Sequence, residues 1–310
     1  MSFSVKAKNE LARKISMSDC CVLSELSAFA HVAGKIELKG AGRIQFHMNT
    51  EHSPTARCIL SLIKTKLHIR AKLVTKENLL KKKHIYSISV NDSDEAKQLL
   101  TRLKLLDENG GMHFELDETL FEDDCCEVAF LRGCFLGSGS ISDPEKGYHL
   151  EIVLNSKEFC DGLLNILSKH DIKSGQIERK ETHVIYIKES DSLIRFLTII
   201  GAYSSILELE NIRISKDMMN NINRAANCEA ANYTKTVDAS VRQVRAIIHL
   251  AEIGQLEKLA PSLHIIAETR MNNKSASLNE LVMLMDGTVG KSGINHRLRK
   301  ICEISESFKR

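Results

Sequence analysis

The sequence predicts an α+β domain built by duplication, followed by an all-α domain. Three observations indicate this architecture. A segment near the N-terminus recurs 105 positions later, apolar residues alternate at period two in several stretches before residue 212, and this alternation stops beyond that point. We expect a first half at 1–110, a second half at 111–211, a linker at 212–234 and a helical domain at 235–310.

The bulk composition is that of a globular protein with more than one domain. The chain has 310 residues, of which 43% are hydrophobic and 27% are charged, and it has three prolines. No apolar stretch approaches the roughly 20 residues that cross a bilayer, and the charged N-terminus lacks a signal-peptide core. We therefore expect a cytoplasmic protein without a membrane partner. The net charge of +3 is too small to indicate a partner by itself.

The repeat pairs residues 18–36 with residues 123–141. The two segments, SDCCVLSELSAFAHVAGKI and DDCCEVAFLRGCFLGSGSI, share six identities in register. The identical pairs are Asp19 with Asp124, Cys20 with Cys125, Cys21 with Cys126, Leu26 with Leu131, Gly34 with Gly139 and Ile36 with Ile141. Each segment reads as an apolar helix that ends at a glycine, the residue that most readily takes a left-handed conformation beyond a helix.

A matching series of elements follows each copy of this helix. Alternation predicts strands at 42–49, 84–90, 148–155 and 183–189. Apolar spacing of three and four predicts helices at 55–67, 93–106, 158–170 and 190–203, the second and fourth of which begin at residues suited to N-capping. Each half therefore reads α-β-β-α-β-β-α.

The nonapeptides at 26–34 and 131–139 resemble two degenerate copies of the LAGLIDADG motif of homing endonucleases. In that family the two motif helices pack side by side, above saddle-shaped sheets that lie on DNA. Small residues allow helices to approach closely, and Gly133 and Gly137 supply them in the second copy. An unrelated α+β duplication is the alternative interpretation.

The cleavage chemistry of that family needs an acid at the eighth motif position of each helix, because the metal ions that activate water prefer carboxylate oxygens. Here the eighth positions are Ala33 and Ser138, and the sixth positions, His31 and Leu136, offer no replacement pair. The resemblance therefore implies a fold that is retained and a reaction that is lost, with no enzyme activity and no metal at these positions.

Nine cysteines include two adjacent pairs, at 20–21 and 125–126, but no CxxC spacing that would indicate zinc. We expect reduced thiols that pack as small buried hydrophobes. The sequence thus predicts no metal, no cofactor and no small-molecule substrate.

A run of eight basic residues lies between 64 and 83, with Glu77 as the one acid, which gives a local charge of +7. The basic residues are Lys64, Lys66, Arg70, Lys72, Lys76, Lys81, Lys82 and Lys83. On a saddle-shaped sheet they would contact the DNA backbone, and the alternative is an ordinary solvated surface. The ERKE segment at 178–181 in the second half is neutral, so any contact of this domain with DNA would be one-sided.

Beyond the linker, two helices are expected before the most informative segment. Residues 237–254 fit an amphipathic helix that ends at Gly254. Ser262 can cap a helix that runs toward Met271, after the break at Pro261. These helices would form the body of the C-terminal domain.

The segment 277–301 then has helix-turn-helix order. A helix begins at Ser277, a tight turn falls at Asp286-Gly287, and a second helix with apolar residues on one face begins at Lys291. The residues that we expect to contact DNA are Ser277, Lys291, Ser292, Asn295, His296, Arg297, Arg299 and Lys300. Ser292, Asn295 and His296 would reach base edges, and the lysines and arginines would meet phosphates. A plain helical hairpin with a solvated basic face is the alternative.

Taken in order, these parts resemble the WhiA family along nearly the whole chain. They are the doubled acid-free domain, the segment NRAANCEAANYTKTV and the segment SLNELVMLM…GKSGINHRLRKICEIS. The resemblance implies a regulator, found mainly in Gram-positive bacteria, that binds double-stranded DNA in the nucleoid and acts in sporulation, cell division or chromosome segregation. It also implies a C-terminal domain similar to the promoter-reading domain of sigma factors.

Two other classes of function stay open. An active metal-dependent endonuclease could draw on acids that lie nearby in sequence, namely Glu37, Asp143 or Glu151. A protein-interaction scaffold would use the helical domain to bind another transcription or division protein in place of DNA. The concentration of basic residues, Asn and His on the last helix argues against the scaffold.

Overall fold

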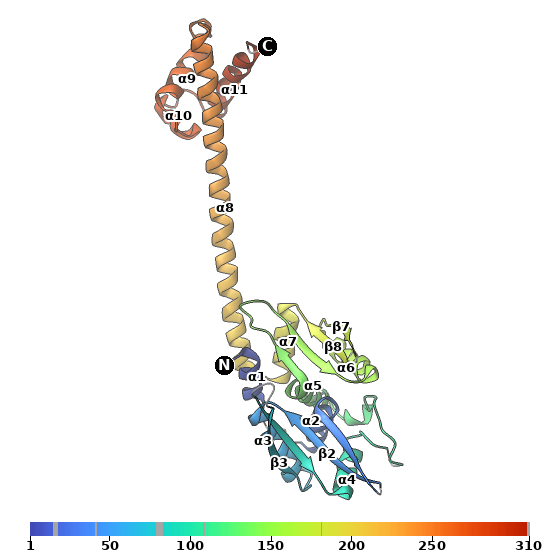
Figure 1. The fold of residues 1–310 in the computed structure, drawn as a ribbon. Coiled ribbons are helices and arrows are strands. Elements are labelled where there is room, and N and C mark those ends of the chain that lie inside the picture. The colour runs from blue at the N-terminus through green and yellow to red at the C-terminus, as the bar shows by residue number, and fades with distance from the viewer. Residues whose placement is uncertain (15–17, 41, 79–82, 108, 181, 309–310) are drawn as a thin grey trace. The chain divides into compact units, whose positions relative to one another are not determined.

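The chain forms two compact units, Met1–Ser215 and Lys216–Arg310. The computed structural model describes residues 1–14, 18–40, 42–78, 83–107, 109–180 and 182–308. The first unit is α+β and the second is all-α, which confirms the predicted fold class (Figure 1). Within the described ranges, no helix has both the length and the apolar character needed to cross a membrane.

The two halves of the first unit repeat one order of elements. After α1 (Phe3–Leu11), the first half contains α2 (Asp19–Ala33), β1 (Gly34–Lys39), β2 (Arg43–Thr50), α3 (Ser53–Thr65), β3 (Lys72–Asn78), β4 (Lys83–Val90) and α4 (Ser93–Arg102). After the short helix η1 (Glu118–Leu120), the second half contains α5 (Asp124–Ser138), β5 (Gly139–Ile141), β6 (Leu150–Leu154), α6 (Lys157–Lys169), β7 (Gly175–Arg179), β8 (Thr182–Ile187) and α7 (Ser190–Ile200). The predicted order α-β-β-α-β-β-α is confirmed in both halves.

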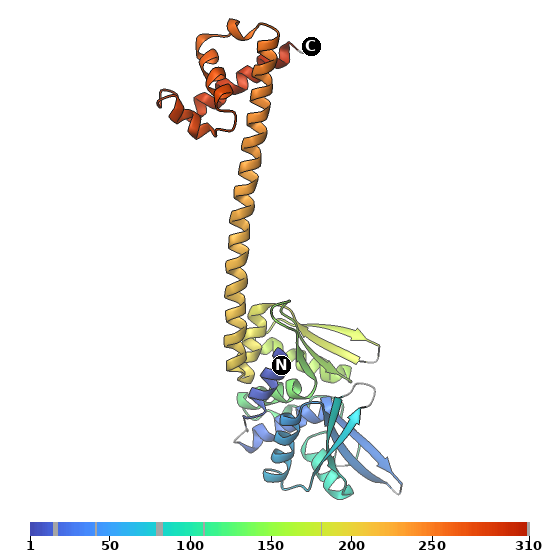
Figure 2. The ribbon, with the colours of Figure 1, turned by 60° about the vertical axis from the view of Figure 1, so that its left-hand side comes forward.

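Each half has one four-stranded antiparallel sheet, ordered β1-β2-β4-β3 in the first and β5-β6-β8-β7 in the second. Figure 2 shows the two sheets as separate layers of the first unit. In β2, Ile44, Phe46 and Met48 are buried in the core, and the residues between them point away from it, because successive side chains of a strand alternate between faces. Each sheet therefore has an outer face turned away from the core.

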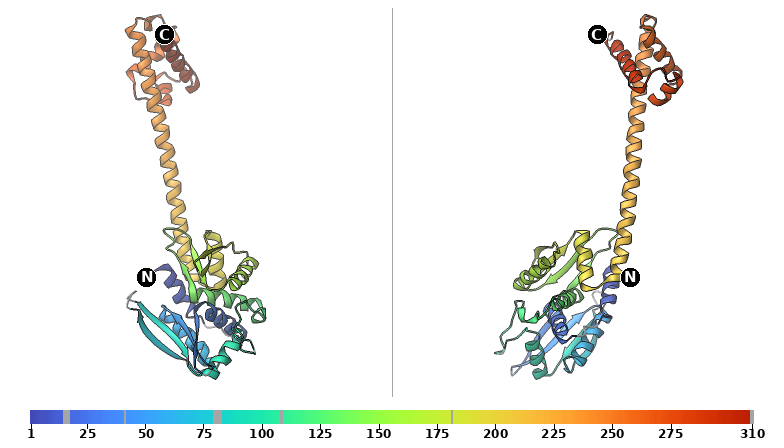
Figure 3. Two further views of the ribbon diagram at one scale, coloured as in Figure 1. Left: turned by 45° about the vertical axis from the view of Figure 1, so that its right-hand side comes forward. Right: turned by 180° about the vertical axis from the view of Figure 1, so that it is seen from behind.

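Helices α2 and α5 pack side by side in parallel at the centre of the first unit (Figure 3). A Cβ atom on Gly133 would lie 2.2 Å from the carbonyl oxygen of Glu25, and one on Gly137 would lie 2.2 Å from Val32 Cγ2. Both distances are far inside van der Waals contact, so the two glycines permit the close approach of the helices. Their predicted role is confirmed.

The glycines that follow these two helices are not left-handed. Gly34 has a φ of −81° and Gly139 a φ of −67°. A Cβ atom on Gly34 would lie 2.2 Å from the carbonyl oxygen of Ala30, and one on Gly139 would lie 2.4 Å from Phe135 Cδ2. The predicted left-handed conformation is therefore wrong, and crowding at the helix–strand junction accounts for both glycines.

Of the two cysteine pairs, Cys21 and Cys126 are buried as expected, whereas the expectation of a buried thiol is wrong for Cys125. The Sγ atoms of Cys20, Cys21, Cys125 and Cys126 all lie within 4.8 Å of one another, and Cys125 is exposed. The parallel packing of α2 and α5 brings the pairs together, because each pair lies in the first turn of its helix.

The predicted linker at 212–234 lies inside one helix, α8 (Tyr203–Glu252). Residues 203–252 contain neither glycine nor proline, the two residues that most strongly interrupt a helix. Helix α8 consequently continues through residue 237, where we expected a new helix. The boundary between the two compact units falls within α8, after Ser215.

The second unit packs α9 (Pro261–Asn272), α10 (Leu278–Leu284) and α11 (Lys291–Ser307) against the last turns of α8. Its core contains Ile247, Leu250, Ile266, Ala267, Leu281, Ile294, Leu298 and Ile301. The predicted cap at Ser262 is wrong, because α9 begins at Pro261, and the first position of a helix tolerates the missing N–H of proline. The turn at Asp286-Gly287 is confirmed by positive φ angles of 50° and 66°.

Candidate nucleic-acid interface

Helix α11 exposes the face that its sequence pattern predicts. Ile294, Leu298 and Ile301 are fully buried in the core of the second unit. The exposed residues of the opposite face are Lys291, Ser292, Asn295, His296, Arg299 and Lys300, and Arg297 is half-buried. The segment from Lys291 to Lys300 contains no acid, although Lys300 Nζ lies 3.7 Å from Glu303 one turn further on. One side of α11 thus offers amide, imidazole, hydroxyl and cationic groups together.

Ser277 caps the helix that precedes the turn. Its hydroxyl oxygen accepts a hydrogen bond from the Glu280 N–H at 3.3 Å, and the Ser277 N–H donates to Glu280 Oε2 at 2.6 Å. These reciprocal bonds form a capping box at the start of α10, and bonds from Ser277 lower the pKa of the Glu280 carboxyl. The cap fixes α10 and, through the short turn, the position at which α11 begins.

A pocket of about 530 Å³ brings Ser277, Lys291 and Asn295 together. The residues of α8 that also line it are Asn232, Lys235, Thr236, Ala239 and Gln243. Sequence reasoning missed this face of α8, because residues 212–234 lack an apolar stripe and the place of Lys235 beside Lys291 depends on packing. Arg270, which is buried and also lines the pocket, donates from Nη1 to the carbonyl oxygen of Ala276 at 2.5 Å and so holds the segment before α10.

In the first half, the strand register gathers cations on the outer face of the sheet. Lys35, His47, Ser89 and Lys72 lie opposite one another across β1, β2, β4 and β3. By the alternation of side chains, the same face also carries Lys39, Arg43, Lys76 and the acid Glu37. Sequence reasoning missed Lys35, Lys39 and Arg43, because it did not align β1 against β2.

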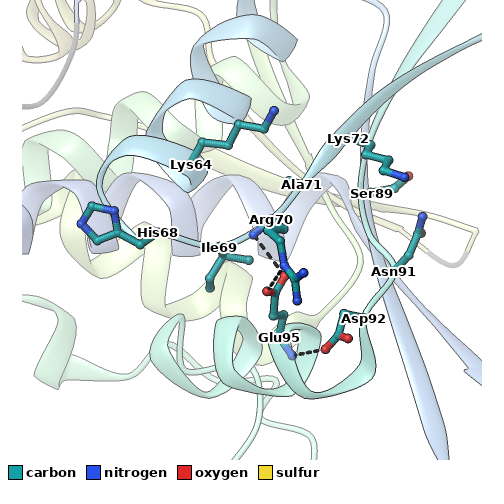
Figure 4. A pocket seen from close by; sticks show the side chains of 10 residues that line it. All are labelled: Lys64, His68, Ile69, Arg70, Ala71, Lys72, Ser89, Asn91, Asp92 and Glu95. Atoms are coloured by element: carbon teal, nitrogen blue, oxygen red, sulfur yellow. Dashed lines mark hydrogen bonds and ion pairs between the residues drawn. The ribbon is translucent and has the colours of Figure 1, made fainter.

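The basic run from 64 to 83 does not form one surface. Lys64, Arg70 and Lys72 line a pocket of about 660 Å³ at the end of α3 and the start of β3 (Figure 4). Figure 4 shows Arg70 turned toward Glu95 of α4, and Arg70 Nε lies 2.6 Å from Glu95 Oε1. The positive charge of Arg70 is therefore compensated.

The remaining residues of this run are dispersed. Lys66 Nζ lies 3.7 Å from Asp19 Oδ1. Lys81 and Lys82 lie outside the described residues. Lys83 begins β4, and the structure describes its backbone only. Lys72 and Lys76 lie on the outer sheet face by register.

The corresponding face of the second sheet carries little charge. Arg179 Nη2 lies 2.7 Å from Glu151 Oε1, so these two charges offset each other. Val153 and Val184 lie opposite each other on the same face, with Ile177 beside them. In the ranges that the structure covers, the two sheets thus present outer faces of different character.

Ala33 and Ser138 end α2 and α5, at the same end of the helix pair. Near Ser138, Lys8 of α1 donates from Nζ to the carbonyl oxygen of Leu136 at 3.2 Å, and Lys8 and Ser138 line one pocket. Burial lowers the pKa of the Lys8 ammonium to about 8, so most of it remains charged at neutral pH. Like-charge repulsion from this cation disfavours a divalent ion at Ser138.

The three acids considered as alternative metal ligands of an endonuclease each contact a nearby cation or backbone N–H group. Glu37 Oε1 lies 2.6 Å from Lys39 Nζ, and Glu151 Oε1 lies 2.7 Å from Arg179 Nη2. Asp143 Oδ1 accepts a hydrogen bond from a backbone N–H two residues on, at 3.1 Å. These contacts hold the three carboxylates to cations or backbone rather than to one another.

The whole chain is similar to known proteins. Three family models match it: the WhiA N-terminal LAGLIDADG-like domain at 19–106, the WhiA LAGLIDADG-like domain at 127–219 and the WhiA C-terminal HTH domain at 222–305. A probable cell division protein WhiA of Clostridium beijerinckii is 44% identical over 314 residues, covering 100% of this chain and 99% of the relative. The crystal structure of full-length DUF199/WhiA from Thermatoga maritima matches with a TM-score of 0.61 at 28% identity, covering 99% of each chain.

Proposed function

The chain belongs to the WhiA family, and from this membership we propose that it is a sequence-specific DNA-binding regulator of transcription. Its process is cell division, chromosome segregation or sporulation, the first of which accords with the name of its relative from Clostridium beijerinckii. The partner is double-stranded DNA, and the protein acts in the nucleoid.

The observation that carries this proposal is the exposed face of α11. A helix enters the major groove with one side, and that side must be exposed and polar. In this proposal Ser292, Asn295 and His296 contact base edges, because they lie in the first turns of α11. Lys291, Arg297, Arg299 and Lys300 contact phosphates, and Ser277 and Lys235 extend this contact from the rim of the pocket.

The first sheet supplies a second, weaker contact that does not read sequence. Lys35, Arg43, Lys72 and Lys76 share its outer face and would release counterions from the DNA backbone, whereas Lys39 is paired with Glu37. The outer face of the second sheet lacks such a cluster among its described residues, so the contact is one-sided.

The first unit binds DNA without cutting it in this proposal. The eighth motif positions, Ala33 and Ser138, provide no carboxylate to a metal ion. The Lys8 ammonium beside Ser138 is a further obstacle to a divalent ion.

The experiment measures binding of the full chain to fragments of genomic DNA and to random-sequence DNA, by fluorescence anisotropy over a series of salt concentrations with Mg²⁺ present. Asn295→Ala should weaken specific binding about 5- to 150-fold, because a bidentate base contact contributes about 1–3 kcal/mol of discrimination. Arg299→Ala should weaken binding to both kinds of DNA and reduce the salt slope by about 0.9. Lys258→Ala, which removes an exposed charge of η2 (Leu256–Lys258), is the matched control.

Three results would contradict the proposal. Equal binding by wild type, Asn295→Ala and Arg299→Ala would exclude α11 as the reading helix and favour a scaffold. A loss of binding in Lys258→Ala as large as that in Arg299→Ala would indicate an effect of net charge alone. Cleavage that depends on Mg²⁺ would show an active endonuclease.

A further inference from the structure

Four cysteines meet where the two repeats of the first unit join. Cys20 and Cys21 lie in the first turn of α2, and Cys125 and Cys126 lie in the first turn of α5. Their four Sγ atoms lie within 4.8 Å of one another, and Cys21 Sγ is 3.2 Å from Cys125 Sγ. The two cysteine pairs occupy equivalent positions of the repeat, because the tripeptide DCC occurs at 19–21 and again at 124–126.

The spacing of these sulfurs matches a single tetrahedral metal ion. Zn–S bonds of about 2.3 Å in a tetrahedron place the sulfur atoms about 3.8 Å apart. The Cys21–Cys125 Sγ distance of 3.2 Å is below this value and the upper limit of 4.8 Å is above it, so small rotations about χ1 suffice. An iron–sulfur cluster fits less well, because its thiolates bind different iron atoms and stand further apart.

The surroundings suit a thiolate site. Each cysteine pair lies in the first turn of its helix, where the positive end of the helix dipole favours a thiolate. The Arg132 guanidinium, which is ion-paired with Glu25 at 2.7 Å, also interacts with Cys21. Cys21 and Cys126 are buried whereas Cys125 is exposed, which gives a metal ion a path of entry.

We propose that Cys20, Cys21, Cys125 and Cys126 form a structural site for one Zn²⁺ ion, which cross-links the two halves of the first unit. Each thiol releases its proton to solvent as its sulfur binds the metal, so four protons leave for one ion bound. A disulfide between Cys21 and Cys125 would use two of the four sulfurs, whereas the metal uses all of them. This inference does not depend on DNA binding.

The test uses the full chain, purified in reducing buffer without chelators. Elemental analysis should find one zinc per chain, and replacement of zinc by Co²⁺ should give the intense visible absorption of a tetrahedral thiolate site. Cys21→Ser and Cys126→Ser should each weaken zinc binding by more than about 100-fold. Cys160→Ser, which removes a buried thiol of α6 outside the cluster, should bind zinc as wild type does.

A second measurement uses the wild-type chain, so that it tests the site even if a variant does not fold. Zinc should protect the four cluster cysteines from alkylation, as mapped by mass spectrometry, while the exposed Cys228 reacts equally with and without the metal. The absence of stoichiometric zinc, bound iron in its place, or a Cys21–Cys125 disulfide in the protein as isolated would each overturn the proposal. Unchanged zinc affinity in folded Cys21→Ser would do so as well.

Discussion

The contact between α2 and α5 can be tested by adding one carbon atom. In Gly133→Ala the new Cβ would lie 2.2 Å from the Glu25 carbonyl oxygen and 2.9 Å from Ala28 Cβ. Ordinary contact begins at 3.4 Å, so the first distance falls short by 1.2 Å. The nearest atom belongs to the backbone and cannot rotate away, so the two helices themselves must move apart.

The expected loss of stability follows from two opposing effects. Overpacking of a core costs about 1–3 kcal/mol, and the upper end applies because the backbone must shift. Alanine is favoured over glycine inside a helix by about 1 kcal/mol. The net loss is about 2 kcal/mol, which lowers the melting temperature of a unit of this size by about 4–8 °C.

Calorimetry or circular dichroism of the full chain measures this shift, with Gly147→Ala as the control. A Cβ on Gly147 would meet no atom within 4 Å, so this variant should stay within about 0.5 kcal/mol of wild type. If Gly133→Ala melted at the same temperature as Gly147→Ala, the inference that α2 and α5 are in close contact at Gly133 would be wrong.

Two further predictions concern a histidine cap and a serine cap. Burial, followed by the charges of Lys8 and Arg57, lowers the pKa of His52 from 6.5 to about 4. The unfolded chain therefore binds the proton first as pH falls, and stability is lost between pH 6.5 and about 4. His52→Asn keeps an N-cap for α3. In this variant the free energy of unfolding, measured with urea, should depend less on pH over this window. A pH dependence equal to that of wild type would contradict the assignment. Ser277→Asp keeps the cap of α10 but repels phosphate, so DNA affinity should fall several-fold at an unchanged melting temperature, whereas Ser277→Ala should lose about 1 kcal/mol of stability. Unaltered affinity in Ser277→Asp would place this residue away from DNA.

Much of the fold could be predicted because its signals are local. Period-two alternation in β2 and apolar spacing in α11 are visible in a single segment, and both assign the correct residues to the core. The course of α8 could not be predicted in the same way, because residues 212–234 are polar and lack the apolar stripe that distinguishes a helix from a linker.

The candidate site could also be predicted only in part, where its residues lie on one segment. The exposed face of α11 follows from the buried positions of Ile294, Leu298 and Ile301 on the same helix. Lys235 could not be assigned, because its place beside Lys291 depends on how α8 packs against α11. Lys35 and Arg43 join Lys72 only through the register of the strands that carry them.

The sequence by itself determined the duplication, the order of elements in each half and the polar face of the last helix, since these depend on residue periodicities within one segment. Only the tertiary structure decided that the two DCC tripeptides meet and that the cations of β1, β2 and β3 share one face. The physical reason is that such contacts join residues up to about a hundred positions apart, and helix pairing and strand register, rather than local periodicity, select them.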